Sequence, residues 1–298
     1  MEEATPPEPS CSYNMGMQYS LETYKPKPSD DLIRVGRAFD GGYVLNERAL
    51  RQTKYLLSFG VNDDWSFEAD FLYRNPGVNI YCFDNSVSKK AFGDNIVDSL
   101  NQILSVRFVL GLLLLNLRGA RNKIYNLMRA KKIYSDFCQF FARSNVRFVA
   151  KGISSVASSS FLTMSDVFRL IPQDGLAENS VFIKMDIEQS EFRVLPDLFK
   201  FRKYVTGFVI EFHDLDILWT NFAELMNRLN EDFEVTHVHG NNFCGLIPNT
   251  ATPRLLEITF LKKSLLQECR PASGTTSYPI PGLDYPNNPE QEDYALHF

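Results

Sequence analysis

Seven short apolar or β-branched runs, spread from residue 55 to residue 261, constrain the fold of this chain most strongly. They are Tyr55–Phe59, Val78–Phe83, Val146–Ala150, Val181–Met185, Val205–Ile210, Phe233–His239 and Leu255–Leu261. Stretches with helical spacing lie between several of them, namely Ser66–Arg74, Glu188–Phe199 and Thr220–Leu229. Strands that alternate with helices predict a mostly parallel α/β sheet of seven strands. The nearly all-apolar runs VFIKM and GFVI indicate that helices cover this sheet on both faces.

Composition and targeting signals narrow the class of protein. With 31 Lys and Arg against 36 Asp and Glu, the net charge is −5, which gives no basic footprint for nucleic acid. The five cysteines are scattered and form no CxxC or Cys/His pair at zinc spacing, so they suit a reducing compartment. The acidic, proline-rich start is unlike a signal peptide, and the apolar run at 108–115 is far shorter than the roughly 20 residues of a membrane span. We therefore expect a cytoplasmic protein with no transmembrane span and no nucleic-acid partner.

The chain divides into an arm, one α/β domain and a tail. Residues 1–30 hold five of the fifteen prolines and little apolar periodicity, which predicts a flexible N-terminal arm. The domain is predicted over 31–265 and opens with a β-hairpin around Asp40-Gly41-Gly42, because glycine supplies the positive φ angles of a tight turn. Residues 266–298 form the predicted C-terminal tail.

A helical insert is predicted over 86–145, between the second and third strands. It contains an apolar segment, Ile96–Leu117, and a basic segment, Arg121–Arg143. No acidic residue occurs between Asp98 and Asp136, whereas seven cations do: Arg107, Arg118, Arg121, Lys123, Arg129, Lys131 and Lys132. The pattern is compatible with helices packed on the sheet with solvated basic ends, with a lid for an anionic substrate, or with membrane-surface contact through 107–132.

The ends of the first two strands suggest a nucleoside site, because ligands of such sheets bind beyond the carboxyl ends of the strands. The first strand runs into SFGVNDD (58–64), in which Gly60 and Asn62 suit a turn that needs positive φ angles. The second strand ends at Asp84, twenty-four residues after Gly60, where a carboxylate can bind the hydroxyls of a ribose. Either feature alone also fits a purely structural turn. Together they favour an adenosyl ligand.

Carboxylates follow the fourth strand. Asp186 comes directly after VFIKM, and Glu188 and Glu191 stand where the next helix begins. The two glutamates are explained equally well by the positive end of that helix, whereas Asp186 stands at the predicted crevice. Lys184, inside the strand, is expected to pair with a carboxylate because a buried, unpaired ammonium is costly.

The fifth strand supplies a candidate base. In VIEFH (209–213), Glu211 and His213 alternate onto one face of the strand and Phe212 onto the other. His213 has a pKa suited to removing a proton from a hydroxyl, with Glu211 orienting it, although a histidine bonded in a polar loop fits as well. The sixth strand offers His239, Asn241 and Asn242 at the expected edge of the crevice. We find no nucleophile elbow of the GxSxG type.

At these residues the chain resembles the FkbM-type S-adenosylmethionine-dependent methyltransferases, over roughly 32–263. IKMDIEQSEFRVL (183–195) is similar to that family's Ile-Lys-Ile-Asp-Val-Glu-Gly pattern and its continuation, and FGVN (59–62) to its Val-Gly-Ala-Asn turn. VIEFH resembles the end of its fifth strand. The sequences DGGY (40–43), LLSFGVNDDWSFE (56–68) and YPNNP (285–289) resemble one branch of the family.

The resemblance implies a Rossmann-like sheet with an antiparallel seventh strand and the transfer of a methyl group from S-adenosylmethionine to a hydroxyl of a sugar or other small molecule. It also implies roles for individual residues. The implied cofactor-binding residues are Phe59, Gly60, Asn62, Asp63, Asp84, Asn85 and Asp186. The implied catalytic residues are Asp186, Glu188, Glu211 and His213, and no metal ligand is assigned.

Two other classes of function remain open. One is a catalytically silent binding module, since Ser58, Asp64 and Gln189 replace an acid and two glycines of the family pattern. The other is a metal-dependent glycosyltransferase, since Asp186-Ile187-Glu188 has the acid-x-acid form that binds a divalent cation on a nucleotide sugar.

Overall fold

The computed structural model describes residues 19–105, 117–266 and 277–298. Its centre is a seven-stranded sheet of order β10-β11-β9-β8-β3-β4-β5. The strands are β3 (Tyr55–Phe59), β4 (Asn79–Phe83), β5 (Val146–Val149), β8 (Val181–Met185), β9 (Val205–Phe212), β10 (Phe233–Leu246) and β11 (Pro253–Lys262). Strand β11 runs antiparallel to both of its neighbours, whereas the β5-β4-β3-β8-β9 pairs are parallel. The predicted α/β, Rossmann-like architecture is therefore confirmed.

The strand order reverses between β3 and β8. From β3 the chain moves outward through β4 and β5, then returns to β8 on the other side of β3 and continues to β9. In an open α/β sheet, this reversal leaves a crevice beyond the carboxyl ends of the two central strands, where ligands bind. Residues that follow β3, β4, β8 and β9 therefore meet at one edge of the sheet.

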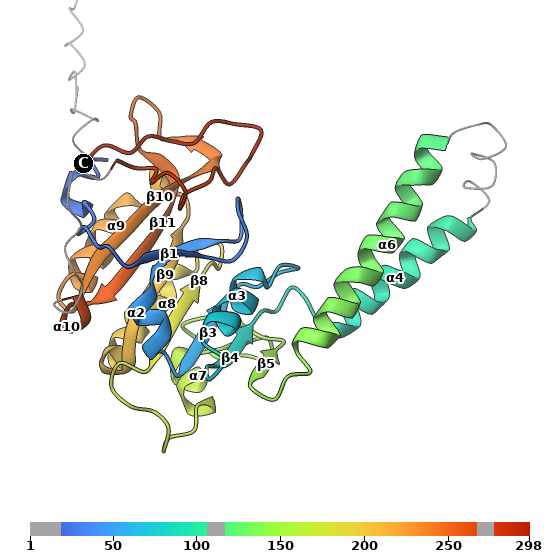
Figure 1. The fold of residues 1–298 in the computed structure, drawn as a ribbon, viewed down its shortest axis with the longest axis horizontal. Helices are drawn as coiled ribbons and strands as arrows, with labels where there is room; N and C mark the ends of the chain where they lie inside the picture. The colour runs from blue at the N-terminus through green and yellow to red at the C-terminus, as the bar shows by residue number, and fades with distance from the viewer. Residues whose placement is uncertain (1–18, 106–116, 267–276) are drawn as a thin grey trace, which may run out of the picture.

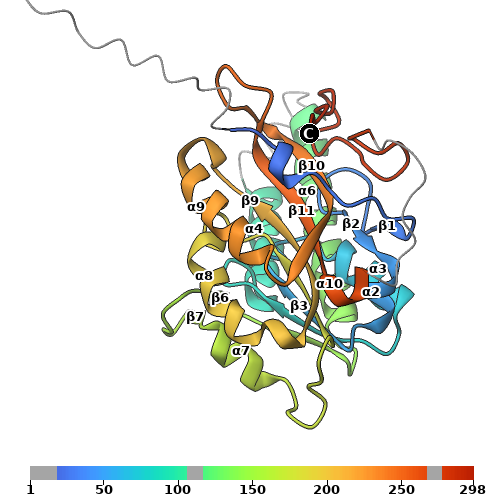
Figure 2. The same ribbon diagram turned by 90° about the vertical axis from the view of Figure 1, so that its left-hand side faces the viewer.

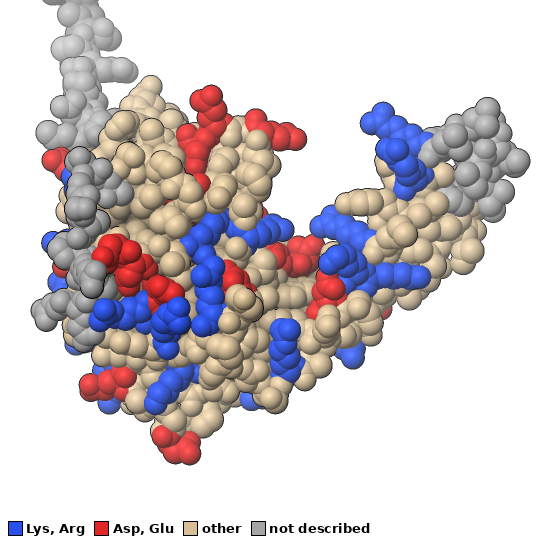
Figure 3. Space-filling model, viewed as in Figure 1, with Lys and Arg blue, Asp and Glu red and all other residues tan. Residues whose placement is uncertain are grey.

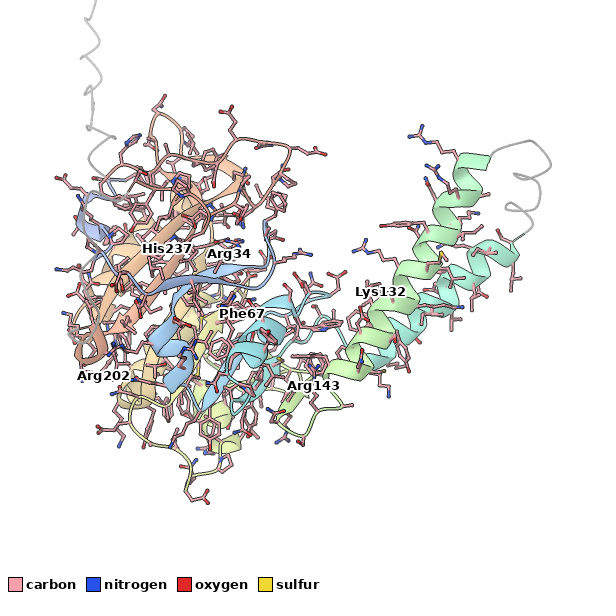
Figure 4. All side chains as sticks on the ribbon, in the orientation of Figure 1. Arg34, Phe67, Lys132, Arg143, Arg202 and His237 are labelled. Atoms are coloured by element: carbon pink, nitrogen blue, oxygen red, sulfur yellow. The ribbon has the colours of Figure 1, made fainter. Side chains whose placement is uncertain are left out.

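Helices cover both faces of the sheet, as its all-apolar strands predict (Figure 2). On one face lie α7 (Met164–Leu170), α8 (Glu191–Leu198) and α9 (Leu215–Leu229), whose buried side chains include Phe168, Leu195 and Phe222. On the other lie α2 (Glu47–Gln52), α3 (Ser66–Arg74) and α10 (Lys263–Leu266). Leu50 belongs to a separate buried cluster on this face, as does Phe67 of α3 (Figure 4). The described chain also contains the short elements η1 (Glu22–Tyr24), β6 (Gly152–Ile153), β7 (Phe161–Leu162) and η2 (Phe199–Tyr204).

The predicted entrance hairpin is present. Strands β1 (Leu32–Val35) and β2 (Tyr43–Asn46) pair antiparallel, and Gly41 at the turn has a φ angle of +85°. Strand β2 is fully buried against β10 and β11. The hairpin thus brings Tyr43 over the centre of the sheet.

The insert forms two long antiparallel helices that project from the body of the protein (Figure 1). They are α4 (Lys89–Leu104) and α6 (Leu117–Phe140), so the first helix begins and ends earlier than predicted. This helix pair, and not the N-terminal segment, is called the arm from here on. Phe92 and Phe137 pack together at the base of the arm with ring centroids 5.2 Å apart. The apolar run at 108–115 lies outside the described residues. Among those that the structure describes, no helix is both long and apolar enough to span a membrane.

Residues on both sides of the predicted domain, 31–265, pack against it. Leu21 and Tyr24 are buried, and Tyr24 packs edge-on against Phe222, so residues 19–30 belong to the fold because they bury aromatic surface. Residues 277–298 lie over β10 and β11, where Asp284 bonds to His237 at 3.0 Å (Figure 4). These contacts are long-range, so local composition did not reveal them.

His239 anchors the same C-terminal segment. Its Nδ1 lies 3.1 Å from Glu257 on β11, and its Nε2 lies 3.0 Å from Asp293. Burial lowers the pKa of His239, but its bonds to Asp293 and Glu257 and the charge of Asp284 outweigh burial and raise it to about 10. The imidazolium therefore holds the segment on the sheet at neutral pH.

We expect this cluster to make stability fall at high pH. Because the folded pKa exceeds the ordinary value of 6.5, the stabilisation is complete below pH ~6.5 and is lost as pH rises through 10. Urea unfolding at pH 7 and pH 10 should show wild type losing about 2–4 kcal/mol more than His239→Gln. His297→Gln, at an exposed histidine, is the matched control and should behave like wild type. Equal losses in wild type and His239→Gln would contradict the assignment.

Candidate functional site

A pocket of about 330 Å³ lies at the reversal of strand order, beyond the carboxyl ends of β3, β4 and β8. Gly60 forms its floor, and its amide donates a hydrogen bond to the Phe83 carbonyl at 3.1 Å. Gly60 has a φ angle of +76°, and a Cβ there would lie 1.7 Å from the Asp186 carbonyl oxygen. Only glycine fits between these two strand ends. The lining is Phe59, Gly60, Phe83, Asp84, Asn85, Ser86, Gly152, Ile153, Phe161, Asp186, Ile187, Glu188 and Ser190.

Asp84 organises the turn on this pocket. Its Oδ2 accepts hydrogen bonds from the amides of Val61 and Asn62 at 3.0 and 2.8 Å, and its Oδ1 accepts two from Ser86. Burial raises the pKa of Asp84, but the hydrogen bonds from Ser86, Asn62 and Val61 outweigh it and lower the pKa. A carboxylate has about four acceptor positions, all used here within the chain. A ribose hydroxyl could bond to Asp84 only by replacing the Ser86 hydroxyl. Asp84 therefore caps the turn in this structure, and its role in binding a nucleoside stays a prediction.

The two short strands that follow β5 add residues that the sequence analysis missed. Gly152 and Ile153 on β6 and Phe161 on β7 line the pocket together with Gly60. A Cβ on Gly152 would lie 2.8 Å from the Phe161 ring and 3.0 Å from Asn85 Oδ1, so a side chain there would narrow the pocket. The two short strands carry no strong sequence signal, although the glycine was a usable clue. Phe161 thus gives the pocket an aromatic surface and Ile153 an aliphatic one, which together suit a flat ring.

Asp63 does not line this pocket. Its carboxylate forms an ion pair with Arg129 of α6 at 3.1 Å. Asn62 has a positive φ of 50°, as predicted, but it too lies outside the lining. Five of the predicted cofactor residues therefore lie together in the pocket lining: Phe59, Gly60, Asp84, Asn85 and Asp186. Asn62 contributes only its backbone amide, which donates to Asp84. Asp63 instead connects the body of the protein to α6 through its ion pair with Arg129.

Beside the pocket, His213 lies among four carboxylates. Its Nδ1 is 3.0 Å from Glu191 Oε1, while its Nε2 is 3.7 Å from Asp186 and 3.8 Å from Glu211. Glu188 lies 3.6 Å from the same Nε2 and is exposed to solvent. The predicted catalytic group of Asp186, Glu188, Glu211 and His213 is therefore assembled around one imidazole, because the carboxyl ends of β8 and β9 are adjacent.

The pKa values of both His213 and Glu211 are raised in this group, which favours their protonated forms. Burial lowers the pKa of His213, but its bond to Glu191 and the nearby carboxylates outweigh burial and raise the pKa above 6.5. Burial, followed by repulsion from Asp186, raises the pKa of Glu211 well above its usual range. Negative charge is thus in excess here, and the group would readily accept a cation or a proton.

Lys184 and Tyr43 contact the carboxylates around His213 from the buried side. Lys184 is buried, donates to the Gly60 carbonyl and lies 3.6 Å from Asp186 Oδ2, which is the pairing expected of it. Burial lowers its pKa, but Asp186 and Glu68 outweigh that effect and keep the pKa raised. The Tyr43 hydroxyl lies 3.4 Å from Glu211 and 3.5 Å from Asp186. The sequence offered DGGY as a signal, but only the fold reveals that its tyrosine reaches the site.

The three candidate residues on the predicted sixth strand, His239, Asn241 and Asn242, have different surroundings in the structure. Strand β10 continues to Leu246, so His239 lies within the strand and serves the C-terminal segment rather than the crevice. Asn242 bonds to backbone carbonyls of that segment, including that of Asn288. Asn241 alone reaches the site, where it donates to Glu211 Oε1 at 2.9 Å.

The three departures from the family pattern lie outside the pocket lining. Ser58 is buried and bonds to Glu68 beneath the first-strand turn. Asp64 pairs with Arg37 at 2.9 Å, and Gln189 bonds to Asp214 at the start of α9. Each residue has a local structural role, and none fills the space of the pocket.

No protein-family model matches the chain, and no curated protein matches it. Among solved structures it is similar to precorrin-6y C5,15-methyltransferase from Geobacter metallireducens GS-15, with 12% identity over 72% of this chain and 87% of that one and a TM-score of 0.35. It is also similar to an O-methyltransferase from Bacillus cereus in complex with SAH (12% identity, 72% and 76% coverage, TM-score 0.32). A third is the Methanococcus jannaschii fibrillarin pre-rRNA processing protein (9% identity, 72% and 68% coverage, TM-score 0.35).

Proposed function

We propose that this protein is an S-adenosylmethionine-dependent methyltransferase of the FkbM type that methylates a hydroxyl oxygen of a sugar or other small molecule. One observation carries the proposal: the glycine-floored pocket at the reversal of strand order opens directly onto the Asp186, Glu211 and His213 group. Asp186 belongs to both, and Glu188 of the pocket lining lies 3.6 Å from His213 Nε2. A cofactor in the pocket would therefore lie next to side chains suited to acid-base chemistry.

The lining fits an adenosyl group. Ile153 and Phe161 offer apolar surface for a flat base, and Asn85 and Ser86 offer polar atoms for the ribose. Bound S-adenosylmethionine would supply an electrophilic methyl group on a sulfonium. The chain's own contribution is then to align an acceptor hydroxyl and take its proton, and we assign these tasks to Asp186 and His213.

Thermal unfolding in the presence of ligands tests this proposal against its two alternatives. A ligand that binds only the folded state at about 100 times its dissociation constant adds about 2.7 kcal/mol of stability. We expect S-adenosylhomocysteine to raise the melting temperature by several degrees, and uridine diphosphate with Mn²⁺ to add nothing beyond Mn²⁺ alone.

The reverse result would favour the metal-dependent glycosyltransferase. No shift with either ligand, in a protein that melts cooperatively, would favour the silent binding module.

We also propose that the arm contacts an anionic membrane surface. Arg118, Arg121 and Tyr125 succeed one another at spacings of three and four residues, so they share one exposed face of α6. Arg129 and Lys132 continue the same face in ion pairs with Asp63 and Asp136. Blue side chains of the arm border the hollow between it and the body (Figure 3). Met128 of α6 and Leu104 of α4 are 67% and 77% exposed. Cations suit anionic lipid headgroups, and exposed apolar side chains on the same helix pair suit the boundary with the acyl chains.

Co-sedimentation with vesicles tests this contact. Each cation near an anionic surface contributes about 1 kcal/mol, so Arg118→Gln/Arg121→Gln should weaken binding roughly thirtyfold. Arg202→Gln/Arg228→Gln, at exposed positions on the body, is the charge-matched control. Equal binding to neutral vesicles, or an unaffected double variant, would overturn the proposal. Binding to RNA in place of vesicles would overturn both it and the expectation of no nucleic-acid partner.

A further inference from the structure

The imidazole of His213 has one bonded and one open nitrogen. Its Nδ1 is 3.0 Å from Glu191 Oε1, which itself accepts a hydrogen bond from the Ile187 amide. Its Nε2 is 3.7 Å from Asp186 Oδ1 and 3.8 Å from Glu211 Oε1, beyond hydrogen-bonding distance. His213 is 7% exposed, and this nitrogen faces three carboxylate oxygens at ion-pair distance, those of Asp186 and Glu211 and, at 3.6 Å, Oε2 of exposed Glu188.

The spacing of these three atoms matches the ligand shell of one cation. All three lie within 4.8 Å of one another. With metal–ligand bonds of about 2.1–2.2 Å, neighbouring ligand atoms are about 3.0–3.1 Å apart in an octahedron and about 3.4–3.6 Å apart in a tetrahedron. The observed 3.7 and 3.8 Å are wider than either, so small side-chain rotations would bring the three atoms to ligand distance of one cation.

Other side chains fix the orientation of each ligand. Metal-bound histidines usually donate the second ring nitrogen to a carboxylate, as His213 does to Glu191. Lys184 lies near the second oxygen of Asp186, and Asn241 donates to Glu211. The three oriented ligands therefore have the supporting contacts of a metal site, which a repulsive cluster of surface acids does not have.

We propose that Asp186 Oδ1, Glu211 Oε1 and His213 Nε2 bind one divalent cation, and that this cation binds the acceptor hydroxyl of the proposed methyl transfer. Two carboxylates with one imidazole suit Mn²⁺ among the common divalent cations. The inference rests on the proposed function for its acceptor, but the cation site itself does not.

The cation changes the role of His213 and narrows the class of acceptor. Three protein ligands leave about three positions of an octahedron open, which two neighbouring oxygens of a diol and one water would fill. The bound hydroxyl loses its proton to solvent or to exposed Glu188, and its oxygen attacks the methyl carbon. The new C–O bond forms as the C–S bond breaks, which turns the sulfonium into a neutral thioether. His213 is then a ligand rather than the base.

Calorimetric titration of the chelator-treated full chain with Mn²⁺ tests the site without any acceptor. We expect one Mn²⁺ per chain, with affinity lowered at least tenfold in both Glu211→Gln and His213→Asn, each checked for folding by circular dichroism. Glu224→Gln, which removes an exposed carboxylate on α9, is the matched control and should bind like wild type. Absence of binding at millimolar Mn²⁺, or equal affinity in both variants and wild type, would overturn the site.

A parallel titration with S-adenosylmethionine separates the two proposals. Cofactor binding without Mn²⁺ binding overturns the cation site and leaves the proposed function standing. Residue-dependent Mn²⁺ binding without cofactor binding supports the cation site and overturns the methyl transfer that we attach to it.

Discussion

Gly60→Ala is expected to lower the free energy of unfolding by about 3–5 kcal/mol, because it combines overpacking with an unfavourable φ angle. The new Cβ would lie 1.7 Å from the backbone oxygen of Asp186, at a φ angle of +76°. Relief of that contact requires the ends of β3 and β8 to move apart. The same movement would open the floor of the pocket, so cofactor binding should be lost in whatever folded protein remains.

Two other glycines separate the cost of the close contact from the cost of the φ angle. Gly245 has a φ angle of +79° with nothing within 4 Å of the added carbon, so Gly245→Ala measures the cost of the φ angle alone. Gly77 has an ordinary φ angle and open surroundings, so Gly77→Ala should be close to neutral. Urea unfolding of the three variants should rank Gly60→Ala well above Gly245→Ala. Similar costs for these two would mean that the β3–β8 contact is not the constraint that we describe.

Lys184→Met is expected to cost about 3–5 kcal/mol at neutral pH, because it leaves buried carboxylates without their cation. Lys184 is buried between Asp186 and Glu68, and its ammonium also donates to the Gly60 carbonyl. Methionine preserves most of the volume, so the loss reports on charge rather than on packing. Denaturant unfolding measures the change directly.

The controls for Lys184→Met use a second lysine and a double variant. Lys132→Met, in an exposed ion pair with Asp136, should cost less than about 1 kcal/mol. Adding Glu68→Gln to Lys184→Met should recover part of the loss, since it removes one buried carboxylate. If Lys184→Met were as mild as Lys132→Met, the buried carboxylates would not depend on Lys184.

The fold was largely predictable because strands and helices are encoded locally. The all-apolar runs VFIKM and GFVI predict buried parallel strands, and β8 and β9 bear this out. The alternation of Glu211, Phe212 and His213 likewise placed the two polar side chains on one face. Phe212 is packed into the core beside Phe222, whereas His213 faces the carboxylates.

What the sequence did not reveal depends on contacts between distant segments. Tyr43 reaches Glu211 only because the hairpin lies over the sheet, whereas Asn241, predicted at the edge of the crevice, does reach Glu211. His239 was predicted at the crevice, but Asp293, far along the chain, completes its surroundings. No periodicity encodes such pairings. The metal geometry was equally hidden, since its ligands come from two strands and their spacing is a property of the folded sheet.

The most direct test of the account is calorimetric titration of the full chain with S-adenosylmethionine and S-adenosylhomocysteine, repeated on Asp84→Ala. Asp84 holds the amides of Val61 and Asn62, so its loss should deform the turn that borders the pocket. We predict that wild type binds both ligands in the micromolar range and that Asp84→Ala, folded by circular dichroism, binds neither. A wild-type protein that binds neither ligand would contradict the assignment of this pocket to S-adenosylmethionine.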